Sequence, residues 1–472
     1  TVETEVGRTP TFRNGPRVVD LDLIFYNELV YSSEELDEAG GVKKLVVPHE
    51  RVHEREFVLR PLAECVVEVP DRKEAAADCD SKSMIPQFVH PSMNLSVEAL
   101  LRRVTNGGRE TSLQKVVPFI RSKSLSTPGG GKEEEETPYW IWGERTKIMA
   151  VINTTPDSFS DGGDHAALSD AMRFVDSFII TSIPVSAASS ASTPLTLRLS
   201  MVDVIDIGGY STRPGAQEIS SEEEINRVVP VIKAIRSSSN PITSHTLISV
   251  DTFRGEVAKA ALEAGADLVN DVYALTREGN DDILNVVKQA GCPVVMMHSR
   301  GDAGEDKEYD EPGGVIEGIR TELGKKIKRA FDAGVRRWNV MVDPGLGFSK
   351  RVEGNLTIVR RLGDITSPSL SSSTGPTRSL SSSVRSVHPL ANMPVLVGSS
   401  RKSYLGRVIE RQHSSAKERD AATVAAHTAA ILGGAEVIRV HDVVGGWDGV
   451  KVADGLWRKV PSPRLAGHIP GV

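Results

Sequence analysis

Seven polar or charged side chains with complementary chemistry follow short apolar segments between residues 146 and 445. They are Asn153, Asp251, Asn270, Asp343, Lys402, Arg439 and His441. A carboxylate at the end of an apolar segment is costly to desolvate unless a donor-rich partner meets it. A planar heterocycle with adjacent amino and ring N–H groups would supply donors to Asp251 and Asp343, and Asn270 can donate and accept along the same ring edge. These residues therefore predict a pterin-like or guanine-like ligand.

Two of the clusters carry cations that suit phosphate. The seventh apolar segment ends in Gly398-Ser-Ser-Arg401-Lys402, and the eighth ends in Arg439-Val-His441. Arginine presents a fork of N–H donors to phosphate oxygens, and lysine adds a movable point charge. We expect an anionic, phosphorylated substrate, with the amide oxygen of Asn153 offered to a Mg2+ ion that substrate phosphates mainly hold.

One pattern, repeated eight times, would bring these groups together. The segments are IMAVIN from Ile148, VIDIGG from Val204, LISVDTF from Leu247, DLVNDV from Asp267, PVVMMHS from Pro293, NVMVDPGLGF from Asn339, PVLVGSS from Pro394 and EVIRVHDV from Glu436. Helical stretches separate them, such as residues 221–236, which open with a capping box of Ser221 and Glu224. The pattern predicts an α/β fold of the (β/α)8 barrel type, whose strand ends converge on one rim.

Composition limits the class of protein. The chain has 472 residues, and a hydrophobic fraction of 39% is enough for more than one buried core. Lysine and arginine number 56 against 63 acids, and the net charge of -7 argues against a nucleic-acid or anionic-membrane surface. Three cysteines without a CxxC pair argue against a disulfide framework and favour a reducing compartment. No apolar run reaches the roughly 18 residues of a membrane span, so we expect no membrane partner.

Low-complexity tracts mark the expected domain limits. Residues 122–138, SKSLSTPGGGKEEEETP, form the predicted linker between a domain over 1–121 and the barrel over 139–472. Two serine-rich tracts, 182–194 and 367–386, follow helical stretches and precede strands. We expect them to be mobile insertions that emerge away from the C-terminal strand ends. The chain begins at Thr1, so an upstream segment is also expected.

The barrel segments resemble the dihydropteroate synthase family, which joins a dihydropterin diphosphate to 4-aminobenzoate in folate biosynthesis. NTTPDSFSDGG, DIGGYSTRPGA, SVDTF, MMH, DPGLGF, GSSRKSYLG and RVHDV follow in family order over about residues 146 to 460. The resemblance implies a pterin pocket made of Asp251, Asn270, Met297, Asp343 and Lys402. It implies a diphosphate site of Asn153, Thr212, Arg439 and His441, with Asn153 as the Mg2+ ligand, and an aminobenzoate site of Arg213, Pro214, Phe348 and Ser400.

The resemblance also implies a mechanism. The bond between the pterin methylene and the diphosphate ionises and the aryl amine attacks, so no nucleophilic side chain is needed. Arg439 and His441, together with Mg2+, would stabilise charge on the leaving diphosphate. The implied catalytic residues are Lys402, Asp161 and Arg213, and Asp161 would pair with Arg213 when the loops close over the site. One departure is Tyr210, where the family usually has an acidic residue.

Residues 15–27, GPRVVDLDLIFYN, and 47–64, VPHERVHEREFVLRPLAE, resemble the second half of hydroxymethyldihydropterin pyrophosphokinase. That family makes the synthase's substrate, and the resemblance implies a partial α+β, ferredoxin-like domain. Asp20 and Asp22 would share one face of a strand and suit paired Mg2+ ions on ATP phosphates, which Arg13, Arg17, His49 and Arg55 would also meet. Because the first half of that family has no counterpart here, we expect this chain alone to lack kinase activity. The natural protein is expected to be a longer bifunctional or trifunctional eukaryotic folate enzyme.

Two other functions stay open at this point. A pterin-binding methyltransferase barrel would share the carboxylates and the asparagine, but it would not need Arg401, Lys402 or the STRPG loop. A degenerate barrel acting as a scaffold would bind pterin without turnover, an alternative that Tyr210 and the insertions motivate. The family resemblance further implies a homodimer, and the cytoplasm and the mitochondrion are both expected compartments.

Overall fold

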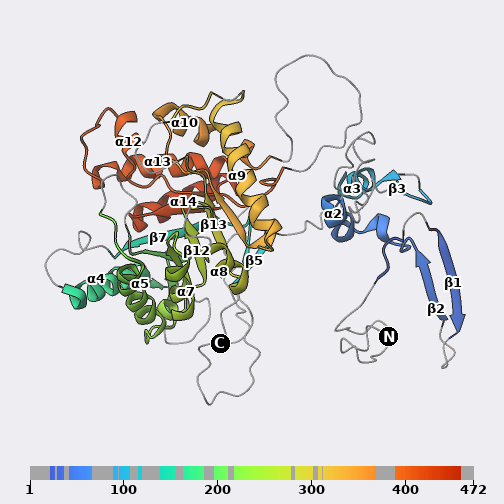
Figure 1. The fold of residues 1–472 in the computed structure, drawn as a ribbon, viewed down its shortest axis with the longest axis horizontal. Coiled ribbons are helices and arrows are strands. Elements are labelled where there is room, and N and C mark those ends of the chain that lie inside the picture. The colour runs from blue at the N-terminus through green and yellow to red at the C-terminus, as the bar shows by residue number, and fades with distance from the viewer. Residues whose placement is uncertain are drawn as a thin grey trace. The chain divides into compact units, whose positions relative to one another are not determined.

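The computed structural model describes most of the chain. The described residues are 22–26, 29–36, 42–65, 89–93, 95–106, 115–119, 139–154, 163–184, 196–210, 217–277, 282–300, 307–310, 312–367 and 388–458. Contacts divide the chain into two compact units: Thr1–Leu113 with Ser379–Val387, and Gln114–Arg378 with His388–Val472. The larger unit carries the barrel (Figure 1).

Eight parallel strands form one sheet in the larger unit. They are β7 (Lys147–Asn153), β10 (Val204–Gly208), β11 (Leu247–Asp251), β12 (Leu268–Asp271), β13 (Val294–Met297), β14 (Val340–Asp343), β15 (Leu396–Val397) and β16 (Val437–Val440). Their order is β14-β13-β12-β11-β10-β7-β16-β15. A parallel bridge between Val342 and Val395 joins the two edges, and the Val342 amide donates to the Pro394 carbonyl at 3.0 Å. The sheet is therefore closed, and the predicted (β/α)8 barrel is confirmed.

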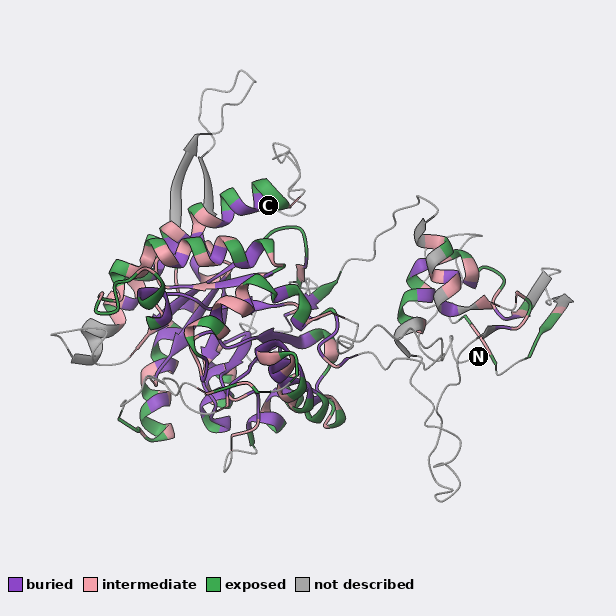
Figure 2. Ribbon diagram, turned by 90° about the horizontal axis from the view of Figure 1, so that it is seen from above, coloured by how far each residue is buried: buried purple, intermediate pink, exposed green. Residues whose placement is uncertain are grey.

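The strands are apolar because both of their faces are covered. Every residue of β10, β12, β13 and β14 is buried, and Figure 2 shows this buried interior at the centre of the barrel unit. A parallel barrel strand faces the barrel interior on one side and helices on the other, so it reads as a continuous hydrophobic run. This explains why the eight segments were recognisable in the sequence.

Helices surround the strands. They are α4 (Gly163–Ser177), α5 (Ser221–Arg236), α6 (Pro241–His245), α7 (Gly255–Ala264), α8 (Asp282–Ala290), α9 (Gly314–Asp332), α10 (Val352–Arg360), α11 (Leu362–Ile365), α12 (Ser403–Val408), α13 (Asp420–Leu432) and α14 (Val443–Trp457). The capping box predicted at Ser221 and Glu224 is wrong by one residue. The Ser220 hydroxyl accepts from the Glu223 amide at 3.1 Å, and Glu224 is instead buried against Arg254.

A short hairpin closes the barrel at the N-terminal ends of its strands. It pairs β5 (Val116–Pro118) with β6 (Tyr139–Ile141) in antiparallel register. Val117, Phe119 and Trp142 pack against Val204, Leu247 and other strand residues at that end. The barrel unit consequently begins at Gln114, earlier than the domain limit expected at residue 121. Residues 116–119 were misassigned because their apolar partners lie across the linker, which no local pattern reveals.

The serine-rich tracts interrupt the barrel on the same side. The first tract begins within a hairpin of β8 (Ile179–Pro184) and β9 (Thr196–Ser200), which lies between α4 and β10. Where the chain re-enters the barrel, the Met201 amide donates to the Phe178 carbonyl at 2.8 Å. The second tract connects α11 to β15, and the Asn392 amide donates to the Thr366 carbonyl at 2.8 Å across its ends. Both tracts thus leave and rejoin the barrel ahead of a strand, away from the C-terminal rim, and residues 185–195 and 368–387 lie outside the described ranges.

The smaller unit is an α+β assembly. It contains β1 (Tyr31–Leu36), β2 (Val42–Val47), a 3-10 turn (Val52–Glu54), α2 (Glu56–Cys65), β3 (Val89–His90), β4 (Leu95–Ser96) and α3 (Val97–Asn106). Val52, Leu59, Val97 and Leu100 form its apolar core. A complete ferredoxin-like topology stays a prediction, since the described strands of this unit pair only two by two. None of the helices in the described ranges is long and apolar enough to cross a lipid bilayer.

Candidate active site

The parallel register brings the predicted polar residues to one rim. Gly208, the last residue of β10, is level with Asn153 on one side and Asp251 on the other. Asp251 is level with Asn270, and Met297 is level with Asp343. The C-terminal ends of parallel strands carry the active sites of (β/α)8 barrels. The side chains that were predicted to act together therefore lie at the edge where barrel chemistry occurs.

Arg439 is the centre of the charge network at this rim. Its Nε donates to Asp206 Oδ2 at 2.6 Å, and its Nη2 donates to Asp251 Oδ2 at 2.6 Å. Asn270 Nδ2 also donates to Asp206 Oδ2, at 3.1 Å. The guanidinium predicted to bind diphosphate is thus held between two carboxylates.

Asp206 is a residue that the sequence reasoning missed. Its side chain is 0% exposed, and it supports both Arg439 and Asn270. The signal was present, because a lone aspartate interrupts the apolar run VIDIG of β10. It went unused because the residue lies inside the strand, and not at the end where chemistry was sought.

Burial and neighbouring charges shift the pKa values of Asp251 and Arg439. Burial raises the pKa of Asp251 to about 7; the attraction of Arg439 opposes this shift, and the negative charge of Asp206 adds to it. Burial works to lower the pKa of Arg439, but Asp206 and Asp251 outweigh it and hold that pKa above its ordinary value. Arg439 therefore keeps its charge, and Asp251 can take up a proton near neutral pH.

Asp343 and Lys402 form a second polar group at the rim. Asp343 Oδ1 accepts from the Gly345 amide at 2.7 Å. The Lys402 ammonium donates to the Leu346 carbonyl and lies 4.6 Å from the centre of the Phe348 ring. Burial lowers the pKa of Lys402 to about 8, against the attraction of Asp343, and burial raises the pKa of Asp343. Lys402 is a cation that can lose its proton within the working range of an enzyme.

The loop after β15 places Ser400 beside His441. The His441 amide donates to Ser400 Oγ at 3.1 Å, and His441 Nδ1 lies 2.9 Å from the same oxygen. Arg401 differs from the prediction that it would meet phosphate. Its Nε and Nη2 donate to the Asp420 carboxylate of α13 at 2.7 and 2.9 Å, which turns the guanidinium towards the helix.

An apolar and aromatic cluster lines the same rim. Phe253, Val272 and Met297 are buried there, with Tyr210, Tyr273 and Phe348 packed against them. The Tyr210 ring meets Phe253 edge to face at 5.8 Å, and the Arg254 guanidinium lies 5.1 Å from the Tyr210 ring centre. Arg254 already forms an ion pair with Glu224, so its guanidinium does not require a second acidic partner at position 210. The aromatic ring of Tyr210 makes a cation–π contact with it instead.

Comparison with known proteins places this site in a family. The model of the pterin binding enzymes matches residues 201–441. The folate synthesis bifunctional protein of Arabidopsis thaliana mitochondria is 36% identical over 465 residues, which cover 97% of this chain and 70% of that protein. The chain belongs to the pterin binding enzyme family.

Single-function relatives match the barrel of this pterin binding enzyme. The dihydropteroate synthase of Synechocystis is 36% identical over 317 residues, covering 67% of this chain and 92% of that protein. The Clostridium difficile dihydropteroate synthase crystallised with pteroic acid superposes with a TM-score of 0.52 at 30% identity, covering 67% of this chain and 99% of that one. The Xanthomonas albilineans enzyme with 4-aminobenzoic acid gives a TM-score of 0.51 at 32% identity over 67% and 95% of the two chains.

The N-terminal unit of this pterin binding enzyme matches a second family model. The model of 7,8-dihydro-6-hydroxymethylpterin-pyrophosphokinase covers residues 1–67. Of the residues predicted to meet ATP, three come together: Arg55 Nη1 donates to Asp22 Oδ2 at 3.3 Å, and His49 Nε2 lies 3.6 Å from that oxygen. The other three lie outside the described residues: Arg13, Arg17 and Asp20. The fusion of a kinase-like part with a pterin-binding barrel is therefore confirmed.

Four of the predicted site residues of the barrel lie outside the described ranges. They are Asp161, Thr212, Arg213 and Pro214. The described ranges contain no group of three or more His, Cys, Asp or Glu side chains placed to hold a metal ion. The residues present fit the expected mode of Mg2+ binding, in which substrate phosphates supply most ligands and the Asn153 amide oxygen at the rim supplies one.

Proposed function

We propose that the barrel is a dihydropteroate synthase, a transferase that condenses 6-hydroxymethyl-7,8-dihydropterin diphosphate with 4-aminobenzoate to give 7,8-dihydropteroate and diphosphate. The observation that carries the proposal is the convergence of Asp251, Asn270, Asp343 and Lys402 on one rim of a barrel of this family. The synthases that share the fold were crystallised with pteroic acid and with 4-aminobenzoic acid. These relatives favour a synthase over a methyltransferase or a scaffold.

The pterin would lie across Asn270, Asp343 and Lys402. Asp343 offers carboxylate oxygen to an amino-pyrimidine edge, and Lys402, whose ammonium also contacts the Leu346 carbonyl, can donate to a ring oxygen or nitrogen. Met297 and Phe348 supply the apolar surface on which a planar ring packs. Asp251, tied to Arg439, completes the polar wall on the other side.

The diphosphate would lie towards Asn153, Arg439 and His441, with Thr212 beside it. Mg2+ held there would neutralise charge on the leaving diphosphate. Arg439 keeps its charge because two carboxylates raise its pKa, so it can stabilise the same charge without moving a proton. His441 is oriented by Ser400, which fixes the ring at the mouth of the barrel.

The arylamine would approach from the side of Phe348 and Ser400, where Arg213 and Pro214 are also expected. The C–O bond to diphosphate ionises and leaves a cation at the pterin methylene, attack of the amine nitrogen then forms the C–N bond, and the amine releases one proton. Arg213 and Asp161 would pair as the loops close and exclude water. The residues hold and orient the reactants, and none of them forms a covalent bond to the substrate.

A homodimer is the proposed assembly. Leu432 of α13 and four residues of α14 expose large apolar side chains: Val444, Val452, Leu456 and Trp457. Since α13 and α14 pack on each other, exposed apolar side chains on both helices favour an interface there. Sedimentation of the purified chain over a range of concentrations measures the assembly directly, and a monomer throughout would contradict it.

The relatives from Arabidopsis and pea named as mitochondrial favour the mitochondrion over the cytoplasm as the compartment.

The activity is tested with the purified chain, dihydropterin diphosphate, 4-aminobenzoate and Mg2+. We expect dihydropteroate to form, and we expect Lys402→Ala to lower the rate by about 100-fold or more, the cost of removing one buried electrostatic donor. Lys259→Ala, an exposed lysine of α7, is the matched control and should keep the wild-type rate. A folded protein that binds the pterin without making product would replace the synthase by the scaffold.

A further inference from the structure

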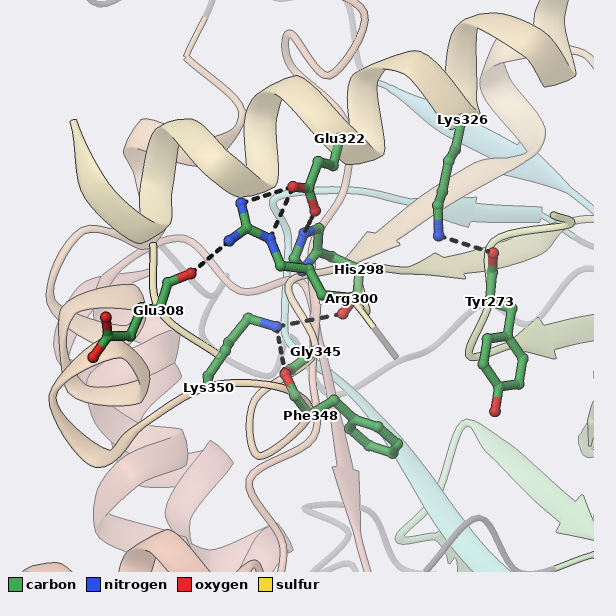
Figure 3. Close-up of polar contacts among 9 residues, drawn as sticks. All are labelled: Tyr273, His298, Arg300, Glu308, Glu322, Lys326, Gly345, Phe348 and Lys350. Carbon is green, nitrogen blue, oxygen red and sulfur yellow. Dashed lines mark hydrogen bonds and ion pairs between the residues drawn. The ribbon is translucent and has the colours of Figure 1, made fainter. Parts of the chain in front are cut away.

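One lysine of the barrel has its charge buried among backbone carbonyl groups. Lys350 is 2% exposed, and its Nζ donates to the carbonyl oxygens of Phe348 at 2.9 Å, Gly345 at 3.0 Å and His298 at 3.4 Å. Figure 3 shows this ammonium pointing at the loop that follows β14 and at the end of β13. Three carbonyl dipoles offset part of the desolvation cost of the ammonium, so the arrangement fixes both chain segments.

The segment in question is residues 344–350, which we call the β14 loop. Its carbonyl groups are divided between two lysines: Gly345 and Phe348 face Lys350, and Leu346 faces Lys402. The loop is held at its other side by Asn355 of α10, whose Oδ1 accepts from the Gly347 amide at 2.7 Å and whose Nδ2 donates to the Lys350 carbonyl at 3.0 Å. Lys350 and Asn355 therefore determine where the Leu346 oxygen and the Phe348 ring are presented.

The β14 loop packs closely against the side chain of Lys402. A Cβ atom on Gly347 would come within 2.7 Å of Lys402 Cδ, and Gly347 has a φ of +75°, which only glycine adopts without strain. The Phe348 ring lies 4.6 Å from the Lys402 ammonium. A displacement of the loop must consequently displace the Lys402 ammonium as well.

Lys350 also contacts the first part of the β14 loop, at Gly345. Gly345 has a φ of +69°, and a Cβ atom there would lie 2.0 Å from the His298 carbonyl oxygen, the same oxygen that Lys350 binds. The chain can pass this close to His298 because Gly345 has no Cβ atom, and the Lys350 ammonium joins the two carbonyl groups at this point. Burial lowers the pKa of Lys350 to about 7, because the ammonium group is removed from water.

We propose that Lys350 is a positioning residue of the proposed synthase reaction, which sets the β14 loop so that Lys402 and Phe348 meet the pterin in the right place. Lys350 itself touches no substrate and acts through the loop. The inference rests on the proposed function, because the pterin is the ligand whose placement it serves.

The test compares Lys350→Met, which keeps the length of the side chain and removes the ammonium, with Lys350→Arg and wild type. Lys328→Met is the matched control, since Lys328 is 67% exposed and pairs with Asp332 on the outer face of α9. For Lys350→Met we expect the KM for dihydropterin diphosphate to rise at least tenfold, and for Lys350→Arg a smaller rise. Lys328→Met should stay within twofold of wild type.

The KM separates positioning from mere support of the fold. A lysine that only stabilised the barrel would reduce the active fraction and the apparent kcat while leaving KM unchanged. A folded Lys350→Met protein whose KM is within twofold of wild type overturns the inference. If Lys350→Met does not fold, Asn355→Asp takes its place, because it keeps the acceptor for Gly347 and removes the donor to the Lys350 carbonyl. Unchanged KM in both Asn355→Asp and Lys350→Arg would equally reject the inference.

Binding keeps the two proposals apart. If wild type makes no product but binds dihydropterin diphosphate by calorimetry, the synthase proposal fails, and the ratio of Kd values for Lys350→Met and wild type decides the inference by the same tenfold and twofold limits. If wild type binds no pterin at all, both proposals are rejected.

Discussion

Asp206 and Asp251 both pair with the guanidinium of Arg439 at the rim of the barrel. One positive charge cannot fully compensate two buried carboxylates, so the set carries a net negative charge in a region of low dielectric. Asp206 is the more enclosed of the two and has Asn270 as a further donor. Burial raises the pKa of Asp251 to about 7.

This shift predicts a pH dependence of pterin binding in the ligand-free chain. Because its pKa is raised, Asp251 gains a proton as the pH falls through about 7. The protonated side chain then lacks the negative charge that attracts N–H donors of the ligand. We expect affinity for dihydropterin diphosphate to decrease below pH 7, approaching about tenfold for each further pH unit. Calorimetric titrations from pH 5 to 8 measure it.

Asp251→Asn is the control for this assignment, because Lys350, with a pKa of about 7, and Lys402, with a pKa of about 8, lose protons in the same range. The variant should bind more weakly at pH 8 and show a flatter profile. A variant profile parallel to that of wild type would assign the titration to another group.

At the residue level, the sequence correctly predicted that polar residues after apolar segments lie at one rim of the barrel, while the roles of these residues stay predictions. The positions of Asn270 and Asp343 could be predicted because the register of a parallel barrel brings the C-terminal ends of its strands to one rim. Arg401 was misjudged because a guanidinium beside a phosphate site and one paired with a helix look alike in sequence, and Asp420 is distant along the chain. Partners separated by many residues are fixed by tertiary packing, which the local pattern does not contain.

At the level of elements, β10 and β11 are tied together beyond the rim by aromatic and cationic side chains. Tyr210 follows β10, Phe253 and Arg254 follow β11, and the guanidinium of Arg254 lies about equally far from both rings, at 5.1 and 4.9 Å. Arg254 also donates to the Ile219 carbonyl at 2.8 Å, just before α5. A single side chain of the segment after β11 thereby contacts both ends of the connection between β10 and α5.

Substitution of Tyr210 tests this coupling. Tyr210→Ala removes the edge-to-face contact with Phe253 and the face over which Arg254 lies, and we expect it to lower the free energy of unfolding by about 1 to 3 kcal/mol. Tyr210→Phe keeps the ring and should stay within about 0.5 kcal/mol of wild type. Urea denaturation measures both. Equal losses in the two variants would show that the hydroxyl group, and not the ring, makes the contact that matters.

At the level of the whole molecule, the N-terminal hairpin decides where the barrel can be separated from the rest of the chain. Val117 and Phe119 are fully buried against the barrel, although they precede the predicted linker. A chain beginning at Gln114 keeps them, and a chain beginning at Tyr139 loses them. The barrel pattern could be predicted from sequence, but this closure could not, because it joins residues on opposite sides of a low-complexity tract.

We expect the chain from Gln114 to unfold at the temperature of the barrel in the full chain. The chain from Tyr139 should be less stable by about 3 to 6 kcal/mol, the transfer cost of two large apolar side chains. Differential scanning calorimetry of the two chains measures the difference. Equal melting temperatures would mean that the hairpin contributes nothing to the stability of the barrel.

The closure of the sheet has a consequence for the order of folding. The seam between β14 and β15 consists of one isolated bridge and a strand of two residues, and that strand arrives only after the second serine-rich tract. Bringing the ends of a long connection together costs chain entropy before any contact repays it. Strands β7 to β14 have longer pairings and can assemble first as an open, curved sheet. We therefore expect the pairing between β14 and β15 to form last, and we expect a longer second serine-rich tract to slow the closure of the sheet.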